Sequence, residues 1–238
     1  MFDSRITILA GHFGSGKSEI AINGAIDAAR AGSPVFLADL DVVKPYFRSR
    51  AARQFLEDSG VTLVAPKGEN VYADLPILLP EVRGLCADSS RKLIMDVGGD
   101  DMGVRVLGAL NDVIPPDETA FYLVLNFRRP FTPDVAAAVQ MARQIEAPSR
   151  LRFTGLIANT HLMDETTPDV VLDGYRLALE TGHELDLPVV AVTAAAPVSD
   201  SLPSEGIDCP VFVLNPMLRA PFRRGPEVRK TGPIFVLN

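Results

Sequence analysis

Short apolar runs alternate along this chain with longer segments whose apolar residues recur every three or four positions. Residues 6–10 form the first apolar run, and residues 17–31 form the first segment with helical spacing. Runs that are apolar throughout are typical of strands buried on both faces of a sheet, and intervening helices favour right-handed crossovers between parallel strands. The pattern therefore predicts an α/β fold, a doubly wound and mostly parallel sheet, formed as a single domain over residues 1–238.

The same apolar pattern predicts where each strand and helix lies along the sequence. Strands are expected at 6–10, 35–38, 61–64, 92–95, 121–125, 154–158, 189–192, 211–214 and 234–237. Helices are expected at 17–31, 48–59, 75–86, 102–110, 132–145 and 168–181. Pro76 fits the first turn of its helix, whereas Pro80 predicts a kink or a break there.

A glycine-rich segment joins the first strand to the first helix. Residues 11–18 read Gly-His-Phe-Gly-Ser-Gly-Lys-Ser and match G-x-x-x-x-G-K-[ST] at every fixed position. The backbone N–H groups of such a loop and the following helix N-terminus bind phosphate, so we expect the P-loop NTPase fold. Lys17 is expected to reach the β- and γ-phosphates and Ser18 to bind Mg²⁺. The residues expected at the nucleotide are Gly11, His12, Phe13, Gly14, Ser15, Gly16, Lys17, Ser18 and Glu19.

Acidic residues follow two of the predicted strands. Asp39 and Asp41 end the second strand, and Asp96 ends the strand at 92–95, ahead of Gly98-Gly99. The carboxyl ends of parallel strands face the crevice that holds the ligand. Asp96 is therefore expected to support the Mg²⁺ ion, and either Asp39 or Asp41 to position the attacking water.

Together these stretches resemble the MinD/ParA-type P-loop ATPases, in the wider group that includes the nitrogenase iron protein and cobyrinic acid synthase-like enzymes. The matching segments are 6–18, 36–50, 93–99, 123–132 and 155–162. The resemblance implies Asp41 as the residue that positions water, Asp39 beside the metal, residues 96–99 as a second switch, and a nucleotide-dependent homodimer. One position departs from the family pattern, because His12 stands where these proteins carry a lysine that crosses the dimer interface.

The end of the strand at 154–158 bears on which base is bound. A guanine-reading pocket needs an aspartate three positions after Asn159, and this chain has Leu162 there, with Asp164 out of register. The amide of Asn159 offers a donor and an acceptor to an adenine edge, and the resemblance also implies an adenine-side Asn at this place. ATP is therefore the expected nucleotide.

Two further groups of basic residues remain open in their roles. Arg128 and Arg129 either neutralise charge on a transferring phosphate or grip a strand-end carboxylate or a partner. Residues 44–50 carry two aromatic side chains and three cations. They form either a partner surface that responds to nucleotide or the start of a helix with Tyr46 and Phe47 buried.

Charge and cysteine content narrow the class of protein. With 23 basic and 30 acidic residues in 238, the net charge is −7, which argues against nucleic acid as the main partner. A basic cluster within residues 219–230 is interpreted as a solvated loop. Two distant cysteines exclude a disulfide scaffold. No leader or membrane span is visible, so a cytoplasmic protein without a membrane partner is expected.

These features lead to one principal hypothesis and one alternative. The first is a Mg²⁺-dependent ATPase with low basal activity that acts as a switch on an unidentified protein client. The alternative is an ATP-dependent biosynthetic kinase or ligase on the same scaffold, which would need a second set of basic residues for its substrate; Arg128 and Arg129 are the candidates. A regulator that binds nucleotide without hydrolysis is disfavoured by the joint presence of Lys17, Asp41 and Asp96.

Overall fold

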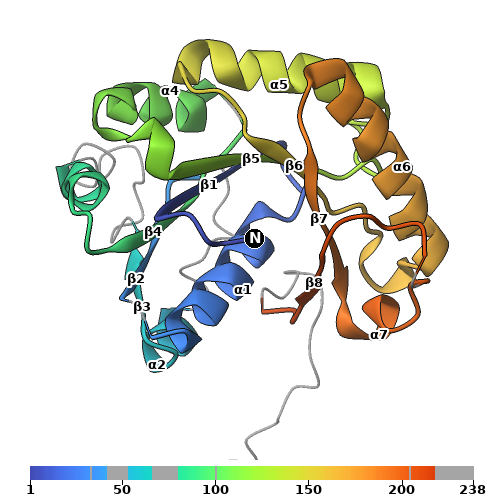
Figure 1. The fold of residues 1–238 in the computed structure, drawn as a ribbon, viewed down its shortest axis with the longest axis horizontal. Helices are drawn as coiled ribbons and strands as arrows, with labels where there is room; N and C mark the ends of the chain where they lie inside the picture. The colour runs from blue at the N-terminus through green and yellow to red at the C-terminus, as the bar shows by residue number, and fades with distance from the viewer. Residues whose placement is uncertain (33, 42–52, 66–79, 100, 204, 218–238) are drawn as a thin grey trace, which may run out of the picture.

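In the described part of the chain, eight strands form one sheet in the order β3-β2-β4-β1-β5-β6-β7-β8, and every neighbouring pair is parallel (Figure 1). The computed structural model describes residues 1–32, 34–41, 53–65, 80–99, 101–203 and 205–217. The strands are β1 Ile6–Ala10, β2 Val35–Asp39, β3 Val61–Val64, β4 Lys92–Asp96, β5 Thr119–Leu125, β6 Gly155–Ala158, β7 Val189–Ala195 and β8 Val211–Leu214. The predicted doubly wound, parallel α/β sheet is confirmed.

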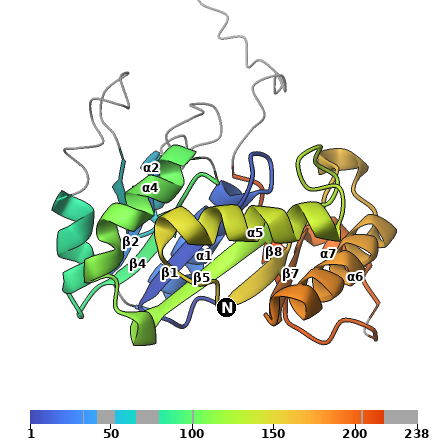
Figure 2. The same ribbon diagram turned by 90° about the horizontal axis from the view of Figure 1, so that it is seen from above.

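Helices cover both faces of this sheet. They are α1 Lys17–Arg30, α2 Arg53–Asp58, α4 Asp101–Leu110, α5 Val135–Ser149, α6 Pro168–Leu185 and α7 Ala196–Ser199, and residues 80–87 are helical as well. Short 3₁₀ turns occur at η3 Asn111–Val113, η4 Pro116–Glu118 and η5 Met163–Glu165. Figure 1 shows α1 on one face and α4 and α5 on the other, and Figure 2 shows α4, α5 and α6 along the same side of the sheet.

The apolar strands build two cores at once. In β5, Phe121 and Leu123 belong to the cluster that contains α4, α5 and α6, while Tyr122 and Val124 belong to the cluster that contains α1. Successive side chains of a strand point to opposite faces, so a strand covered on both sides must be apolar at every position. This is the physical reason for the unbroken apolar runs in the sequence.

Several element boundaries differ from the predicted ones. Helix α5 begins after Asp134, whose side chain accepts a hydrogen bond from Ala137 N at 2.9 Å, and not at Thr132. Such N-caps fix where a helix begins, and the apolar period alone does not reveal them. Strand β7 extends to Ala195 and leads into α7, which was not predicted. Parts of the helices expected at 48–59 and 75–86, and the strand expected at 234–237, lie outside the described residues.

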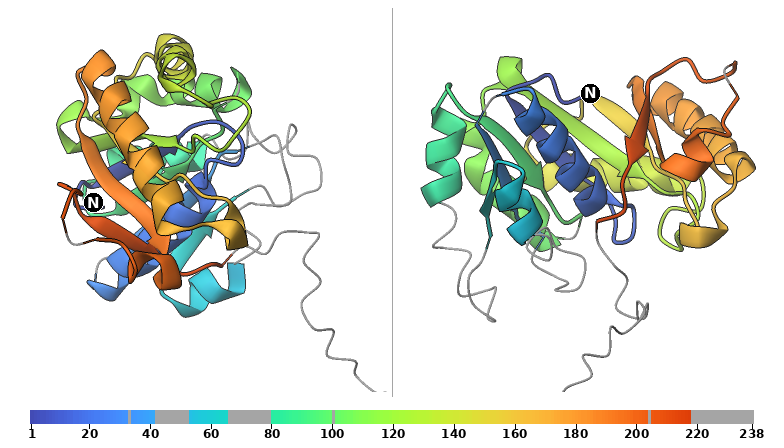
Figure 3. Two further views of the ribbon diagram at one scale, coloured as in Figure 1. Left: turned by 90° about the vertical axis from the view of Figure 1, so that its right-hand side faces the viewer. Right: turned by 90° about the horizontal axis from the view of Figure 1, so that it is seen from below.

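Helix α6 packs tightly against the end of β6 at Gly174. A Cβ atom at Gly174 would lie 2.1 Å from Thr160 Oγ1, the atom that accepts a hydrogen bond from Phe127 N at 3.2 Å. This contact therefore connects α6 to the two loops that follow β5 and β6. Those loops lie beside the loop after β1 at one edge of the sheet (Figure 3, right).

We predict that Gly174→Ala destabilises the protein by about 1–3 kcal/mol, because the added methyl group overpacks Thr160. Gly84→Ala is the matched control: Gly84 is also helical, and a Cβ there meets no atom within 4 Å. Alanine should stabilise that helix by up to about 1 kcal/mol. Urea unfolding of both variants measures the difference, and a Gly174→Ala protein as stable as the parent would contradict the packing argument.

Candidate nucleotide-binding site

The loop between β1 and α1 has a backbone that glycine permits. Gly14 and Gly16 adopt φ angles of +79° and +91°, in the left-handed region that other residues rarely enter. Within the loop, Ser15 N donates a hydrogen bond to His12 O at 3.1 Å. Helix α1 then starts at Lys17 with no side-chain cap on its first turn. Its leading N–H groups are therefore available to an anion.

Asn159 braces the last part of this loop. Its Nδ2 donates to Ser15 O at 2.6 Å, and its Oδ1 accepts from Thr193 Oγ1 at 2.5 Å. A Cβ atom at Gly16 would lie 2.0 Å from Asn159 Nδ2, so this position requires glycine for space as well as for its φ angle. Asn159 thus links the loop to β6 and β7, and its expected contact with the base stays a prediction.

Asn126 and Arg129, from the loop after β5, hold the middle of the glycine-rich loop. Both donate to the carbonyl oxygen of Gly14, Asn126 through Nδ2 at 3.3 Å and Arg129 through Nε at 3.0 Å. The Asn126 side chain also bonds the backbone N–H and carbonyl of His161, each at 3.3 Å. Three loops are therefore joined through one asparagine.

Lys17 is buried at the start of α1. Its Nζ donates to His12 O at 3.3 Å and lies 3.9 Å from Asp41 Oδ2, with only 4% of the side chain exposed. The structure therefore brings two predicted catalytic residues together.

Two acidic side chains meet at the carboxyl ends of β2 and β4. Asp39 and Asp96 are register partners on these adjacent strands and are 2% and 0% exposed. Carboxylates side by side repel each other unless a cation compensates. Mg²⁺ suits this donor set, because it is commonly held by one or two carboxylates together with water and phosphate oxygens. Within the described residues no group of three or more His, Cys, Asp or Glu side chains could hold a metal ion. The metal-binding roles of Ser18, Asp39 and Asp96 stay predictions.

The segment after β4 passes directly against the glycine-rich loop. A Cβ atom at Gly99 would lie 2.4 Å from Gly11 O, and Val97 N donates to Leu9 O at 3.0 Å. Any side chain at position 99 would push these two segments apart. The close approach places the backbone of Gly99 beside the glycine-rich loop.

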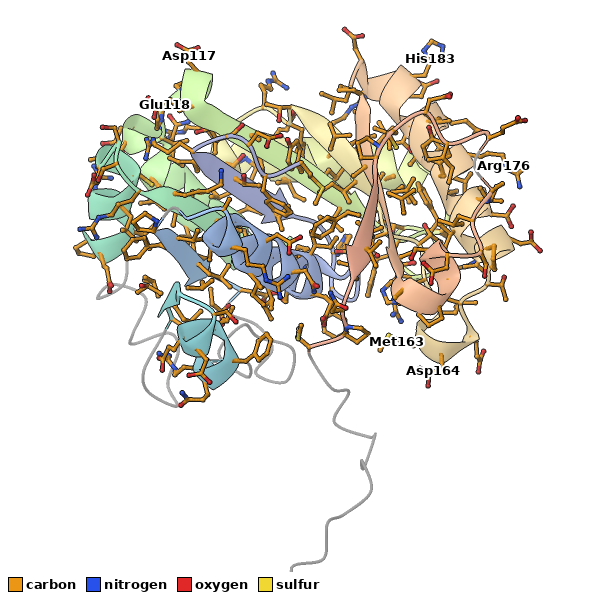
Figure 4. The ribbon with its side chains drawn as sticks, turned by 60° about the horizontal axis from the view of Figure 1, so that its bottom comes forward. Asp117, Glu118, Met163, Asp164, Arg176 and His183 are labelled. Atoms are coloured by element: carbon orange, nitrogen blue, oxygen red, sulfur yellow. The ribbon has the colours of Figure 1, made fainter. Side chains whose placement is uncertain are left out.

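The other residues discussed for the nucleotide site differ in their contacts and in their exposure. The ring of His12 stacks on Phe131 with centroids 5.2 Å apart, and Phe13 is 43% exposed. The Glu19 carboxylate accepts a hydrogen bond from Met217 N, in the chain that follows β8. Leu162 is half-exposed after β6, and Figure 4 shows the neighbouring Met163 and Asp164 at the edge opposite Asp117 and Glu118.

The two adjacent arginines do not act as a pair. Arg128 Nη2 binds the carboxylate of Asp173 on α6 at 3.2 Å, so it does grip an acid, although one on a helix and not at a strand end. Arg129 instead donates a hydrogen bond to the carbonyl oxygen of Gly14. The second basic set that a biosynthetic enzyme would need is therefore not formed by these two residues. Residues 44–50 and the basic cluster at 219–230 lie outside the described residues.

Sequence reasoning missed Thr193, and it placed Asn126 at the same rim of the sheet without giving it a role. Thr193, in β7, holds Asn159, and Asn126 bonds two loops at once. The available signal was a polar residue in or directly after an otherwise apolar strand. That signal marks a position near the crevice but does not say which atoms are bound.

Of the comparisons with known proteins, the one with solved structures finds the same fold. No protein-family model and no curated protein matches the chain. Among solved structures, FtsY of Thermotoga maritima is 20% identical with a TM-score of 0.51, covering 80% of this chain and 61% of its own. The signal recognition particle receptor FtsY of Elizabethkingia anophelis, in complex with GDP, is 18% identical with a TM-score of 0.51, covering 79% and 56%. FtsY of Mycoplasma mycoides is 19% identical with a TM-score of 0.50, covering 77% and 58%.

The fold is thus that of the P-loop NTPases, a class of nucleotide-binding proteins. At 18–20% identity the likeness to FtsY shows the fold alone, and this chain spans less than two thirds of each of those proteins. The resemblance to MinD/ParA-type ATPases is wrong, because these neighbours belong to a different branch, the signal recognition particle GTPases. The segments that carried it, a glycine-rich loop and acidic strand ends, follow from the shared fold. The homodimer and the comparison of His12 with a bridging lysine lose their basis with it.

The described residues contain no helix with the length and apolarity needed to cross a membrane.

The low pKa of the buried His161 should make the stability of the protein depend on pH. Burial, together with the nearby positive charge of Arg129, lowers the pKa of His161 from 6.5 to about 4. Between these values the unfolded chain takes up a proton that the folded protein refuses, so stability is lost as pH falls from about 6.5 toward 4. From pH 7 to pH 5, the parent should lose about 1–2 kcal/mol more stability than His161→Gln. Urea unfolding at both pH values tests this, and equal losses would contradict it.

Proposed function

We propose that this protein is a Mg²⁺-dependent nucleotide-binding switch that hydrolyses ATP slowly and changes its contacts with a partner. One observation carries the proposal. A phosphate loop fixed by three side chains, Asn126, Arg129 and Asn159, stands next to two register-paired buried aspartates, Asp39 and Asp96.

Phosphate binding follows from the loop and the helix behind it. The side-chain donors occupy the carbonyl oxygens of Gly14 and Ser15. The backbone N–H groups of the loop and of the α1 N-terminus remain for an anion, where the helix dipole also favours negative charge. Lys17, buried in this loop, adds a full positive charge.

Asp39 and Asp96, with the Ser18 hydroxyl, are the residues that would hold Mg²⁺. A bound Mg²⁺ ion neutralises charge on the β- and γ-phosphates. When nucleotide is bound, Lys17 would move from Asp41 to the phosphate oxygens. A phosphate group offers Lys17 more negative charge than a partly exposed carboxylate does. After this exchange, Asp41 would orient a water molecule and accept its proton.

The switch itself is proposed at the two segments after β2 and β4. In the first segment, Asp41 pairs with Lys17, the residue proposed to bind the phosphate. In the second, Gly99 packs against the backbone of the glycine-rich loop. Loss of the γ-phosphate would remove contacts from both segments together, which is how other nucleotide switches change shape. A partner that recognises these segments would then distinguish the triphosphate form from the diphosphate form.

Adenine is the proposed base. Leu162 stands where a carboxylate would have to accept hydrogen bonds from guanine, and its side chain is apolar. The FtsY structure with bound GDP makes guanine the competing possibility. The two bases can be separated experimentally.

Lys17→Met should weaken binding of an ATP analogue with Mg²⁺ by at least about tenfold, since a hydrogen bond to a charged group contributes about 1.5–3 kcal/mol. Methionine keeps the buried stem of Lys17 and removes its charge. Lys92→Met, at the opposite edge of the sheet, is the control and should bind as the parent does. Calorimetry measures both, and unchanged affinity in Lys17→Met would refute the phosphate site.

Asp41→Asn should bind nucleotide but hydrolyse it about 10²–10⁴ times more slowly, the usual contribution of a positioned acid or base. Its nucleotide affinity should hold or rise, because Lys17 loses its competing carboxylate. Phosphate release in single-turnover experiments measures the rate. Turnover at the parent rate would transfer the role to Asp39.

The protein should prefer ATP over GTP by about 5- to 150-fold, because a buried donor without a partner costs about 1–3 kcal/mol. Competition of both nucleotides against one fluorescent analogue measures the ratio. A Leu162→Asp variant should shift the ratio toward GTP. Equal affinities in the parent would refute the argument from Leu162.

A further inference from the structure

The side chain of Arg129 packs against the backbone of the phosphate loop at Gly14. Its Nε, Cδ and Cζ atoms are 3.0, 3.3 and 3.4 Å from the position of a Cβ atom on Gly14, and its Nε donates to Gly14 O at 3.0 Å. The guanidinium reaches the loop because Gly14 has no side chain. The loop after β5 presents it from the side opposite Asp39 and Asp96, since β1 stands between β4 and β5 in the sheet.

Most of the hydrogen-bonding capacity of Arg129 is unused. A guanidinium carries five N–H donors, and only the Nε donor has an acceptor among the described residues. No described carboxylate forms an ion pair with Arg129. Two other cations of this region do have carboxylate partners. Arg128 binds Asp173, and Lys17 pairs with Asp41.

This arrangement is costly for the protein alone. The side chain is half-buried, and a neutral carbonyl oxygen does not compensate a charge that has lost part of its water. The charge is also felt locally, since it adds to the effect of burial in lowering the pKa of His161. An anion at the neighbouring loop would supply the missing compensation.

We propose that Arg129 is a second phosphate-binding cation of the site, whose terminal nitrogens donate to phosphate oxygens of the bound nucleotide while Nε keeps the Gly14 carbonyl. The inference rests on the proposed nucleotide-binding function and adds a residue to it. The planar fork of arginine matches two oxygens of one phosphate group, which a lysine at the same place does not. Arg129 would then act on the ligand directly and on the loop at the same time.

The experiment separates the phosphate contact from the support of Gly14. Arg129→Gln removes the charge but keeps an N–H donor for the Gly14 carbonyl, and Arg129→Lys keeps the charge. Arg128→Gln is the matched control, because its parent side chain is already occupied by Asp173. Binding of inorganic pyrophosphate and of ADP, each with Mg²⁺, is measured by calorimetry for the parent and all three variants, with urea unfolding of each protein without ligand.

We expect Arg129→Gln to weaken pyrophosphate and ADP by the same factor, about tenfold or more, because a hydrogen bond to a charged group is lost. Arg129→Lys should recover part of both losses, and Arg128→Gln should bind both ligands as the parent does. The parent and Arg129→Gln should unfold at similar urea concentrations.

Three results would overturn the inference. If Arg129→Gln binds pyrophosphate like the parent, any loss for ADP comes from the sugar or the base. If Arg129→Lys is as weak as Arg129→Gln, the positive charge is not what binds. If Arg128→Gln weakens both ligands equally, the effect belongs to the loop and not to Arg129. A parent protein that binds neither ligand would instead refute the proposed function.

Discussion

A phosphate loop can turn its N–H groups toward one point only if its carbonyl groups find donors elsewhere. In this protein those donors are side chains: Asn126 and Arg129 hold the Gly14 carbonyl, and Asn159 holds that of Ser15. A buried carbonyl without a donor is expensive, so these bonds fix the peptide orientation before any ligand arrives. Preorganisation of this kind avoids an ordering cost at the moment of binding.

The need for donors to these carbonyl groups involves much of the fold, because the donors come from different parts of the sheet. Asn126 follows β5, Asn159 follows β6, and Thr193 in β7 fixes the orientation of the Asn159 amide. Parallel strands bring these ends to one edge, and helices on both faces hold the strands in place. The contact of Gly174 with Thr160 shows how the packing of α6 is transmitted to the same edge. The residues that fix this loop are therefore also part of the packing of the fold.

Much of this arrangement could be predicted from the sequence, and the limit has a physical cause. Apolar runs revealed the strands because both faces are buried, and the loop motif placed Lys17 at the start of the first helix because its spacing is fixed by backbone geometry. The start of α5 was missed because it depends on one hydrogen bond from Ala137 N to Asp134. The separate roles of Arg128 and Arg129 were also hidden, since they depend on Asp173, 45 positions away, and on Gly14, 115 positions away. Long-range partners leave no local pattern.

The same distinction explains why the family resemblance failed while the fold prediction succeeded. A glycine-rich loop and acids at strand ends are what any parallel sheet of this kind needs in order to bind a nucleotide with Mg²⁺. Such residues identify the shared chemistry and do not separate its branches. The loop is also held by contacts that no short motif describes, such as the hydrogen bond from Arg129 to the Gly14 carbonyl and the stacking of His12 on Phe131. The side chains that hold this loop therefore emerge only from the structure, because their partners lie far away in the sequence.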